Sequence, residues 1–324
     1  MMHKLIPAAI PVLLAFTGAL PPTVQEWTVP WPDTRPRDPY VAPNGLVWFV
    51  GQEGNYVANL DPKTGKFDRY EVDEGTHPHN LVVAPDGMVW YTGNRNARLV
   101  MLDPKTRKLT DYPMPDGKAD DPHTMVLDQA GNAWFTAQGA GMIGRRDAKS
   151  GAIRLWSMGN GTRPYGIELD AEQRPWAVLF GTNAIATIDP ATMKERRFEL
   201  PEGARPRRIA VMKSGIWYGD YARGYLGRLD PATGKVTEHV LPGGKGSLPY
   251  AMAGDDKGRI WLAETGVRPN RLVGFDPAAG KFSQMVDTEG GDQPNTIRHM
   301  VFHAPTREIW YGTDRNTVGR LKVP

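Results

Sequence analysis

The stretch from Thr76 to Met114, THPHNLVVAPDGMVWYTGNRNARLVMLDPKTRKLTDYPM, decides the fold. It contains four short β-rich runs, at residues 79–84, 88–92, 99–102 and 109–112. Turn-forming residues separate the runs, as in APDG at 84–87 and DPKT at 103–106. Short runs bounded by Pro, Gly, Asn and Asp predict strands joined by tight turns. One such four-stranded unit cannot bury both faces of its sheet, so it needs neighbours of the same kind.

The rest of the chain supplies those neighbours as repeats of this unit. The second strand of each copy carries a tryptophan, and the seven copies follow one another at spacings of 41 to 49 residues. Seven of the ten tryptophans of the chain fall on this register, which chance does not explain. These tryptophans are Trp48, Trp90, Trp134, Trp176, Trp217, Trp261 and Trp310.

The two ends of the chain complement each other. The seventh copy ends at Pro324 after its third strand, whereas residues 25–30 resemble a fourth strand with no first three before it. Pairing the two closes the repeats into a ring and leaves no long sheet edge unprotected. We therefore predict an all-β fold, a seven-bladed β-propeller of four-stranded blades that the N-terminal strand closes by completing the last blade. Residues 23–324 form this single domain.

Composition narrows the possible functions. The chain has no cysteine, which excludes disulfides, thiol catalysis and thiolate metal sites. Its net charge is only +3 and its basic residues are scattered, so we expect no nucleic-acid partner. We expect a monomer with a small-molecule or peptide ligand at the central channel.

The N-terminus has the pattern of an export signal. A short basic start precedes the apolar residues 5–20, which end in small residues. This pattern predicts a signal peptide over residues 1–22 and a periplasmic or secreted protein. The alternative is a disordered or anchored N-terminal arm. We expect no membrane span in the mature chain, because no later apolar run is long enough.

The first strand of each propeller blade faces the central channel, and ligands usually bind at one channel mouth. Six of the seven first strands begin with proline followed by a large polar residue, and the seventh begins near Arg298. This pattern predicts a basic and aromatic ring of substrate-binding side chains for carbonyl, phenolate or carboxylate groups. The alternative is that these side chains, with water, simply fill the channel. The ring consists of Arg37, His79, His123, Tyr165, Arg207, Tyr250 and His299.

Acidic residues follow the second strands of the last three blades only, as Asp220, Glu264 and Asp314. Together with His299 they offer a base and a carboxylate that orients it or holds a divalent cation. Structural charge balance is the alternative explanation. The residues alone assign no metal ligands.

The repeat pattern resembles that of the streptogramin B lyase (virginiamycin B lyase) family over about residues 25–324. The resemblance lies in RPYGI at 163–167, WFT at 134–136, LGRL at 226–229 and VGRL at 318–321. The resemblance implies a seven-bladed fold and an antibiotic-inactivating lyase. Enzymes of this family open a cyclic depsipeptide at its threonyl ester by elimination, with Mg²⁺ assisting. A histidine base removes the proton next to the carbonyl that the metal polarises.

By this resemblance the catalytic histidine of the family falls on His299, and one of its glutamates falls on Asp314. A second glutamate of the family falls on Ile297, and a second histidine falls on Tyr250. The resemblance therefore implies His299 as the base with Asp314 in support, and Mg²⁺ as the cofactor. In a lyase of this family Glu264, one of the acids after the second strands, would also support the base or a metal, and Tyr250 would contact the substrate.

Three functions stay open at this point. The first is an exported C–O lyase that opens a cyclic ester by metal-assisted elimination. The second is a non-enzymatic periplasmic propeller that binds a small molecule, a peptide or a protein partner at its channel mouth. The third, a calcium-dependent sugar-lactone hydrolase, ranks last because it needs an acidic and amide cage where the predicted ring is basic and aromatic.

Overall fold

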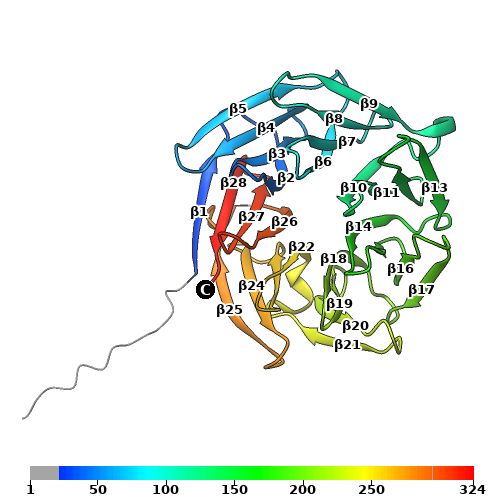
Figure 1. Ribbon diagram of the computed structural model, residues 1–324. Coiled ribbons are helices and arrows are strands. Elements are labelled where there is room, and N and C mark those ends of the chain that lie inside the picture. The colour runs from blue at the N-terminus through cyan, green and yellow to red at the C-terminus, as the bar shows by residue number, and fades with distance from the viewer. Residues whose placement is uncertain (1–21, 294) are drawn as a thin grey trace, which may run out of the picture.

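Residues 22–293 and 295–324 are described by the structure, a computed structural model. Their strands form seven four-stranded antiparallel sheets arranged in a ring around a central channel (Figure 1). This confirms the predicted seven-bladed propeller. The predicted signal peptide, residues 1–22, lies outside the described residues except for its last position. No helix within 22–293 or 295–324 has the length and apolar character needed to cross a membrane.

Each of the first six blades is a meander whose strands run outward from the channel in chain order. Blade 1 contains β2 (Pro36–Val41), β3 (Val47–Gly51), β4 (Tyr56–Asp61) and β5 (Lys66–Glu71). Blade 2 contains β6 (Pro78–Val83), β7 (Val89–Gly93), β8 (Arg98–Leu102) and β9 (Leu109–Pro113). Blade 3 contains β10 (Pro122–Leu127), β11 (Ala133–Ala137), β12 (Met142–Arg146) and β13 (Ile153–Ser157).

The next three blades repeat this order. Blade 4 contains β14 (Pro164–Leu169), β15 (Pro175–Leu179), β16 (Ala184–Ile188) and β17 (Glu195–Glu199). Blade 5 contains β18 (Pro206–Met212), β19 (Gly215–Asp220), β20 (Tyr225–Leu229) and β21 (Val236–Val240). Blade 6 contains β22 (Pro249–Gly254), β23 (Ile260–Glu264), β24 (Arg271–Asp276) and β25 (Lys281–Asp287). Two short 3₁₀ helices, η1 (Pro115–Gly117) and η2 (Gly244–Ser247), lie in the loops between blades.

Blade 7 joins the two ends of the chain. It contains β26 (Ile297–His303), β27 (Glu308–Thr313), β28 (Thr317–Lys322) and, as its outermost strand, β1 (Thr23–Thr28). β1 pairs antiparallel with β28 along its whole length, from Thr23 opposite Lys322 to Thr28 opposite Thr317. Figure 1 shows the blue β1 beside the red β28. The predicted closure by the N-terminal strand is therefore confirmed.

The repeated tryptophan explains how each blade packs internally. In blade 1 the ring of Trp48 lies 4.9 Å from that of Tyr70 on the outer strand. The same second-to-fourth-strand aromatic pair occurs in blades 2, 3, 4 and 5. Its members are Trp90 and Tyr112, Trp134 and Trp156, Trp176 and Phe198, and Trp217 and His239. In blade 7 the partner of Trp310 is Trp27 of β1, at 5.5 Å, so β1 replaces the missing fourth strand in packing as well as in pairing.

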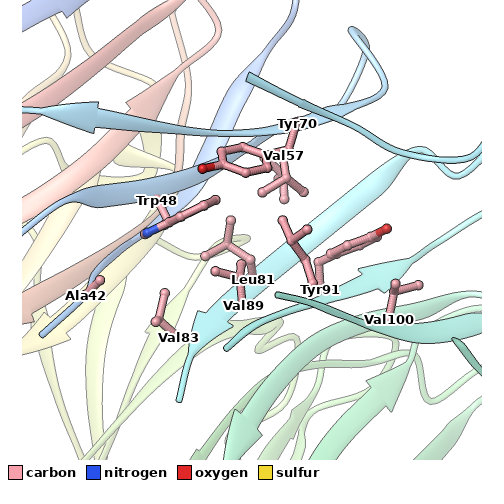
Figure 2. Close-up of a cluster of buried hydrophobic side chains, with 11 residues drawn as sticks. Ala42, Trp48, Val57, Tyr70, Leu81, Val83, Val89, Tyr91 and Val100 are labelled. Carbon is pink, nitrogen blue, oxygen red and sulfur yellow. The ribbon is translucent and has the colours of Figure 1, made fainter. Parts of the chain in front are cut away.

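Neighbouring blades share apolar cores, because successive side chains of a strand point to opposite faces of its sheet. Between blades 1 and 2, Figure 2 shows Trp48, Val57 and Tyr70 facing Leu81 and Tyr91. Of these, Val57 is completely buried and Tyr91 is 1% exposed. Equivalent clusters fill the other blade interfaces.

The repeated aspartates stabilise turns. Asp61 accepts a hydrogen bond from the backbone N–H of Lys63 at 2.9 Å, which is the Asx-turn geometry. In the other type of turn, the Asp170 carboxylate accepts the indole N–H of Trp176 at 2.8 Å. Asp255 binds Trp261 in the same way at 3.0 Å. Asp170 and Asp255 therefore tie the turn to the tryptophan that recurs in the second strand of each blade.

Deleting residues 23–28 should lower the melting temperature by roughly 10 °C or more. The deletion exposes the edge of β28 and removes Trp27 from Trp310, and losing one large packed aromatic costs about 3–5 kcal/mol. In a chain of this size 1 kcal/mol corresponds to about 2–4 °C. Thermal melting followed by circular dichroism measures the change, with a chain that begins at Pro22 as the control. Equal melting temperatures for the two chains would refute closure by β1.

Candidate functional site

The inner strands of all seven blades begin with the same distortion. Each pairs with the second strand at its first residue, and the register then shifts through a bulge before regular pairing resumes. A bulge re-aims the side chains beside it and is common next to functional sites. The residues after the first position therefore need not alternate as they would in a regular strand.

The pairing register corrects the alignment of the last blade by one residue. Ile297 pairs with Thr313 as Pro249 pairs with Glu264, so Ile297 holds the place of the repeated proline. Arg298, and not His299, is therefore the counterpart of Tyr250. Asp314 likewise lies one position beyond the counterpart of Glu264. The sequence suggested His299 for the first ring because it matches His79 and His123 in residue type. The position of the bulge, which fixes the alignment, is visible only in the pairing of β26 with β27.

The corrected first ring lies at the channel mouth and is packed around its circumference. The imidazole rings of His79 and His123 are 3.6 Å apart, and Tyr165 follows at 4.2 Å from His123. The Tyr165 hydroxyl is hydrogen-bonded to that of Tyr250. The Arg207 guanidinium lies 3.7 Å from the centre of the Tyr250 ring. The full ring is Arg37, His79, His123, Tyr165, Arg207, Tyr250 and Arg298.

A second ring lies one residue further along each inner strand. Arg208 spans the channel there, because it donates to the hydroxyl of Thr124 and to the carbonyl of Arg298, each at 3.1 Å. A Cβ at Gly166 would come within 3.0 Å of the Arg208 Cα, so the small residue leaves room for this arginine. The ring consists of Asp38, Asn80, Thr124, Gly166, Arg208, Ala251 and His299.

Asp38 is the charged centre of this second ring. Its carboxylate is completely buried, 3.0 Å from Arg37 Nε and 3.7 Å from a terminal nitrogen of Arg208. The amide of Asn80 donates to it at 2.8 Å. Burial by itself raises the pKa of Asp38, but the positive charges of Arg37, His299 and Arg208 and the hydrogen bond from Asn80 hold it well below its usual range. Asp38 is therefore ionised throughout the neutral range.

The three histidines of the two rings are neutral at neutral pH. Burial is the main cause, since it lowers the pKa of His79 and His123 well below the usual value, and the nearby arginines add to the effect. The pKa of His299 falls to about 4 through burial and the charges of Arg208 and Arg37, although Asp38 opposes the change. His299 accordingly holds a free imidazole lone pair near pH 7.

The two tyrosines differ in their ionisation. Burial raises the pKa of Tyr165, and the charge of Tyr250 raises it further. Burial also acts on Tyr250, but the charges of Arg207, Arg37, Arg208 and Arg298 outweigh it and lower its pKa to about 7. Within this hydrogen-bonded pair Tyr250 is therefore the phenol that loses its proton first, with a pKa of about 7.

Several buried donors in these rings have no hydrogen-bond partner among the described residues. They are Arg37 Nη2, Arg207 Nε and Arg208 Nη2, and His299 Nδ1 is a further unpartnered nitrogen. A buried polar group without a partner costs about 1–3 kcal/mol, and more when it is charged. Unpaired donors at one channel mouth are the arrangement expected of a site that awaits a ligand with acceptor oxygens.

Eight of the predicted residues lie in three places. The substrate-binding candidates Arg37, His79, His123, Tyr165, Arg207 and Tyr250 come together in the first ring. His299 lies in the second ring beside Asp38. Asp314 lies at the rim, where Arg298 binds it through two nitrogens at 3.0 and 2.7 Å.

Glu264 and Asp220 form their hydrogen bonds with residues outside the two rings. Glu264 is completely buried and binds the Arg271 side chain at 2.5 Å and the Gly243 N–H at 2.7 Å. Asp220 is completely buried and accepts from the N–H of Arg205 at 3.0 Å and from the Arg223 side chain at 2.6 Å. Each carboxylate therefore holds the loop that leads into its blade from the preceding one.

The donor set at the mouth does not fit Mg²⁺. This ion prefers several oxygen ligands in octahedral geometry, whereas Asp38 and Asp314 are each occupied by arginine. Within residues 22–293 and 295–324, no group of three or more His, Asp or Glu side chains is placed to hold a metal ion. The positive charge at this mouth comes from guanidinium groups.

Sequence reasoning missed Asp38, Asn80 and Thr124. A usable signal was present, because these polar residues directly follow ring residues in strands that otherwise bury apolar side chains. A separate cavity of about 760 Å³ lies at the opposite ends of the inner strands, where Tyr40, Val82 and Val126 line it. None of the predicted site residues lines that cavity.

Comparison with known proteins gives consistent relatives. A sequence profile of the Virginiamycin B lyase family matches residues 19–272. A virginiamycin B lyase from Nocardia farcinica (strain IFM 10152) is 30% identical over 135 residues, which are 41% of this chain. That match spans only 46% of the length of the relative.

Solved structures show the same fold. A streptogramin B lyase superposes with a TM-score of 0.82 at 24% identity, covering 94% of this chain and 98% of that one. A selenomethionine-substituted virginiamycin B lyase from Staphylococcus aureus has a TM-score of 0.83 at 22% identity, covering 94% and 100%. A catalytically inactive histidine-to-alanine variant of the Staphylococcus aureus enzyme, solved with quinupristin, gives the same values. At these identities the likeness concerns the fold.

Replacing Asp38 by Asn should destabilise the protein by about 3–5 kcal/mol, because it leaves the buried Arg37 and Arg208 without a counter-charge. The matched control is Asp314→Asn, whose carboxylate is 25% exposed and whose loss should cost about 0–1 kcal/mol. Urea unfolding at neutral pH measures both changes.

The pH dependence has a defined sign. Because the folded pKa of Asp38 is depressed, its contribution is complete above the unfolded value of about 3.9 and is lost as pH falls below it. The difference between the wild type and Asp38→Asn should therefore shrink in acid. Equal stabilities of the two substituted proteins at neutral pH would contradict the conclusion that Asp38 is the counter-charge of the buried Arg37 and Arg208.

Proposed function

The chain belongs to the Virginiamycin B lyase family, and on that premise we propose that it is an exported lyase that acts at the arginine-rich channel mouth. The proposed reaction is elimination of a carbon–oxygen bond next to a carbonyl group, as in the opening of a cyclic ester. The observation that supports it most is the combination of a neutral His299 with unpartnered guanidinium nitrogens of Arg37 and Arg208.

Each part of the elimination has a group in these rings. His299 takes the proton from the carbon next to the carbonyl, because its imidazole is neutral near pH 7. The electron pair of that C–H bond forms the new C=C bond, and the leaving oxygen departs with the electrons of the C–O bond. Negative charge develops on the carbonyl oxygen meanwhile, and Arg37 and Arg208 stabilise it electrostatically. Asp38 stabilises the imidazolium that forms.

The assigned roles differ from those that the sequence suggested. Asp38 takes the place beside His299 that was expected for Asp314 and Glu264, since Asp314 is bound by Arg298 and Glu264 by Arg271. Arginines supply the positive charge that the family resemblance attributes to Mg²⁺. Export to the periplasm or the medium rests on the N-terminal pattern of a basic start and an apolar run.

A binding protein without catalysis is the second candidate. The observation that favours it is the close packing of the first ring, in which His79, Tyr165 and Tyr250 are 5% exposed or less. A ligand would then rest on the rim and contact the partly exposed Arg207 and Arg298 without reaching His299.

Incubation with a type B streptogramin such as quinupristin tests the lyase. Mass spectrometry of the product should show a linear molecule of unchanged mass, because elimination adds no water. His299→Ala should reduce the rate by about 10²–10⁴. The control is His303→Ala, at the other end of the same strand, where the imidazole binds the Thr306 hydroxyl.

The outcomes separate the candidates. A product that gains the mass of water would indicate hydrolysis and contradict the elimination. Saturable binding without any product would favour the binding protein. Full activity of His299→Ala would remove His299 as the base.

A further inference from the structure

The channel mouth holds more positive than negative charge. Four guanidinium groups lie in the two rings, on Arg37, Arg207, Arg208 and Arg298. In the described part of the chain, the carboxylates that pair with them are Asp38 and Asp314. The three histidines stay neutral and add no charge.

Tyr250 occupies the centre of this excess charge. Its ring lies 3.7 Å from the Arg207 guanidinium and 5.6 Å from that of Arg298. Its hydroxyl is bound by the Tyr165 hydroxyl, and Tyr165 in turn lies 5.2 Å from the Arg208 guanidinium. Tyr250 is 2% exposed. A negative charge on its oxygen is therefore desolvated and lies among guanidinium groups from two different blades.

The same cluster is open to a ligand from the rim. Arg207 and Arg298 are both partly exposed, and the Arg298 side chain keeps 23% of its surface in solvent. The rings of Phe180 and Tyr221 flank Arg207 at 4.7 and 4.4 Å. A planar acid fits these surroundings, with its carboxylate on guanidinium and its apolar body on the aromatic rings.

We propose that the arginine cluster of Arg37, Arg207, Arg208 and Arg298 binds a carboxylate group, and that this carboxylate takes the place of Tyr250 as the partner of the Arg207 and Arg298 guanidinium groups. The carboxylate brings its own negative charge, so Tyr250 takes up one proton from solvent as the ligand binds. No other bond forms or breaks. The proposal rests on the proposed function and deepens it, because elimination from a cyclic ester releases a carboxylate, the group that this cluster binds.

The contacts of the cluster support the exchange. Arg37 Nη2, Arg208 Nη2 and Arg207 Nε have no hydrogen-bond partner among the described residues, although Arg208 Nη2 lies 3.7 Å from Asp38, so each can still donate to an incoming oxygen. Arg37 and Arg208 are 4% and 3% exposed, and their attraction for an anion is little screened by water. The groups that face Tyr250 from all neighbouring elements are Arg37, Tyr165, Arg207, Arg208, Tyr221 and Arg298, with Asp38, Asp314 and His299 bound to them or beside them.

The sign of the pH effect follows from this exchange. Below about pH 7 Tyr250 is already protonated, so a carboxylate binds without proton uptake and its affinity is highest. Above that pH each unit weakens binding by about tenfold, because the bound state holds one more proton than the free state.

Calorimetric titration of the full protein with benzoate tests the proposal. Titrations at about pH 8 in two buffers of different ionisation enthalpy should show uptake of about one proton per benzoate. Benzamide, which has the same shape but no charge, should not bind measurably. Tyr250→Phe should abolish the proton uptake and make the affinity independent of pH. The control Tyr112→Phe, on the outer strand of blade 2 and away from the channel mouth, should keep the wild-type behaviour.

A second measurement needs neither ligand nor variant. Near-ultraviolet absorbance of the wild type should show one tyrosinate appearing around neutral pH, and saturating benzoate should suppress it. Tyrosinate absent until about pH 10 would overturn the proposal, and so would benzoate that binds no better than benzamide or takes up no proton.

These outcomes are independent of the lyase assay. If benzoate binds with proton uptake but quinupristin does not react, the carboxylate site is supported and the proposed elimination is contradicted. Turnover of quinupristin without proton-coupled benzoate binding would support the elimination and contradict the carboxylate site.

Discussion

The antiparallel pairing of β1 with β28 is the constraint on which the rest of the structure depends. Each blade buries its faces only against its two neighbours, so the cores are complete only when the ring is closed. β1 supplies six residues of pairing and the tryptophan that stacks on Trp310. Closure also fixes the inner strands of blades 7 and 1 side by side, which brings β26 to β2. That juxtaposition places His299 near Asp38.

The closed ring forces unlike side chains into one small space. Seven bulged strand starts converge on the channel mouth, and their second and third residues include four arginines, three histidines and two tyrosines. Such a cluster would be unstable if every group were charged. The structure resolves the conflict by leaving the histidines neutral, by ionising Asp38, and by lowering the pKa of Tyr250 through Arg207 and its neighbours. The low pKa of Tyr250 therefore follows from the arginines that the closed ring packs around it.

The family relationship describes the fold of the chain, whereas the side chains at the channel mouth decide which ligand it binds. The propeller superposes on a streptogramin B lyase and on a virginiamycin B lyase over 94% of the chain. At the mouth, however, arginine pairs with the acidic groups and a tyrosine pair stands where the resemblance places a histidine. Fold likeness alone does not determine which substrate such a site accepts. The charge of the mouth is therefore the better guide to the ligand, and it favours an anion.

The sequence by itself determined the number of blades, the four-strand unit and the closing strand. These depend on local signals, namely the spacing of the tryptophans, the turn residues and the incomplete last copy, and each can be read along the chain. It also identified six of the seven first-ring residues. Only the tertiary structure showed that Arg298 is the seventh, because a bulge shifts the register and strand pairing alone locates it. The ties of Glu264 and Asp220 to loop arginines, and the meeting of Asp38, Arg208 and His299, were likewise decided in three dimensions. Those residues are far apart in the chain, and their charges and pKa values depend on neighbours that the closed ring brings together.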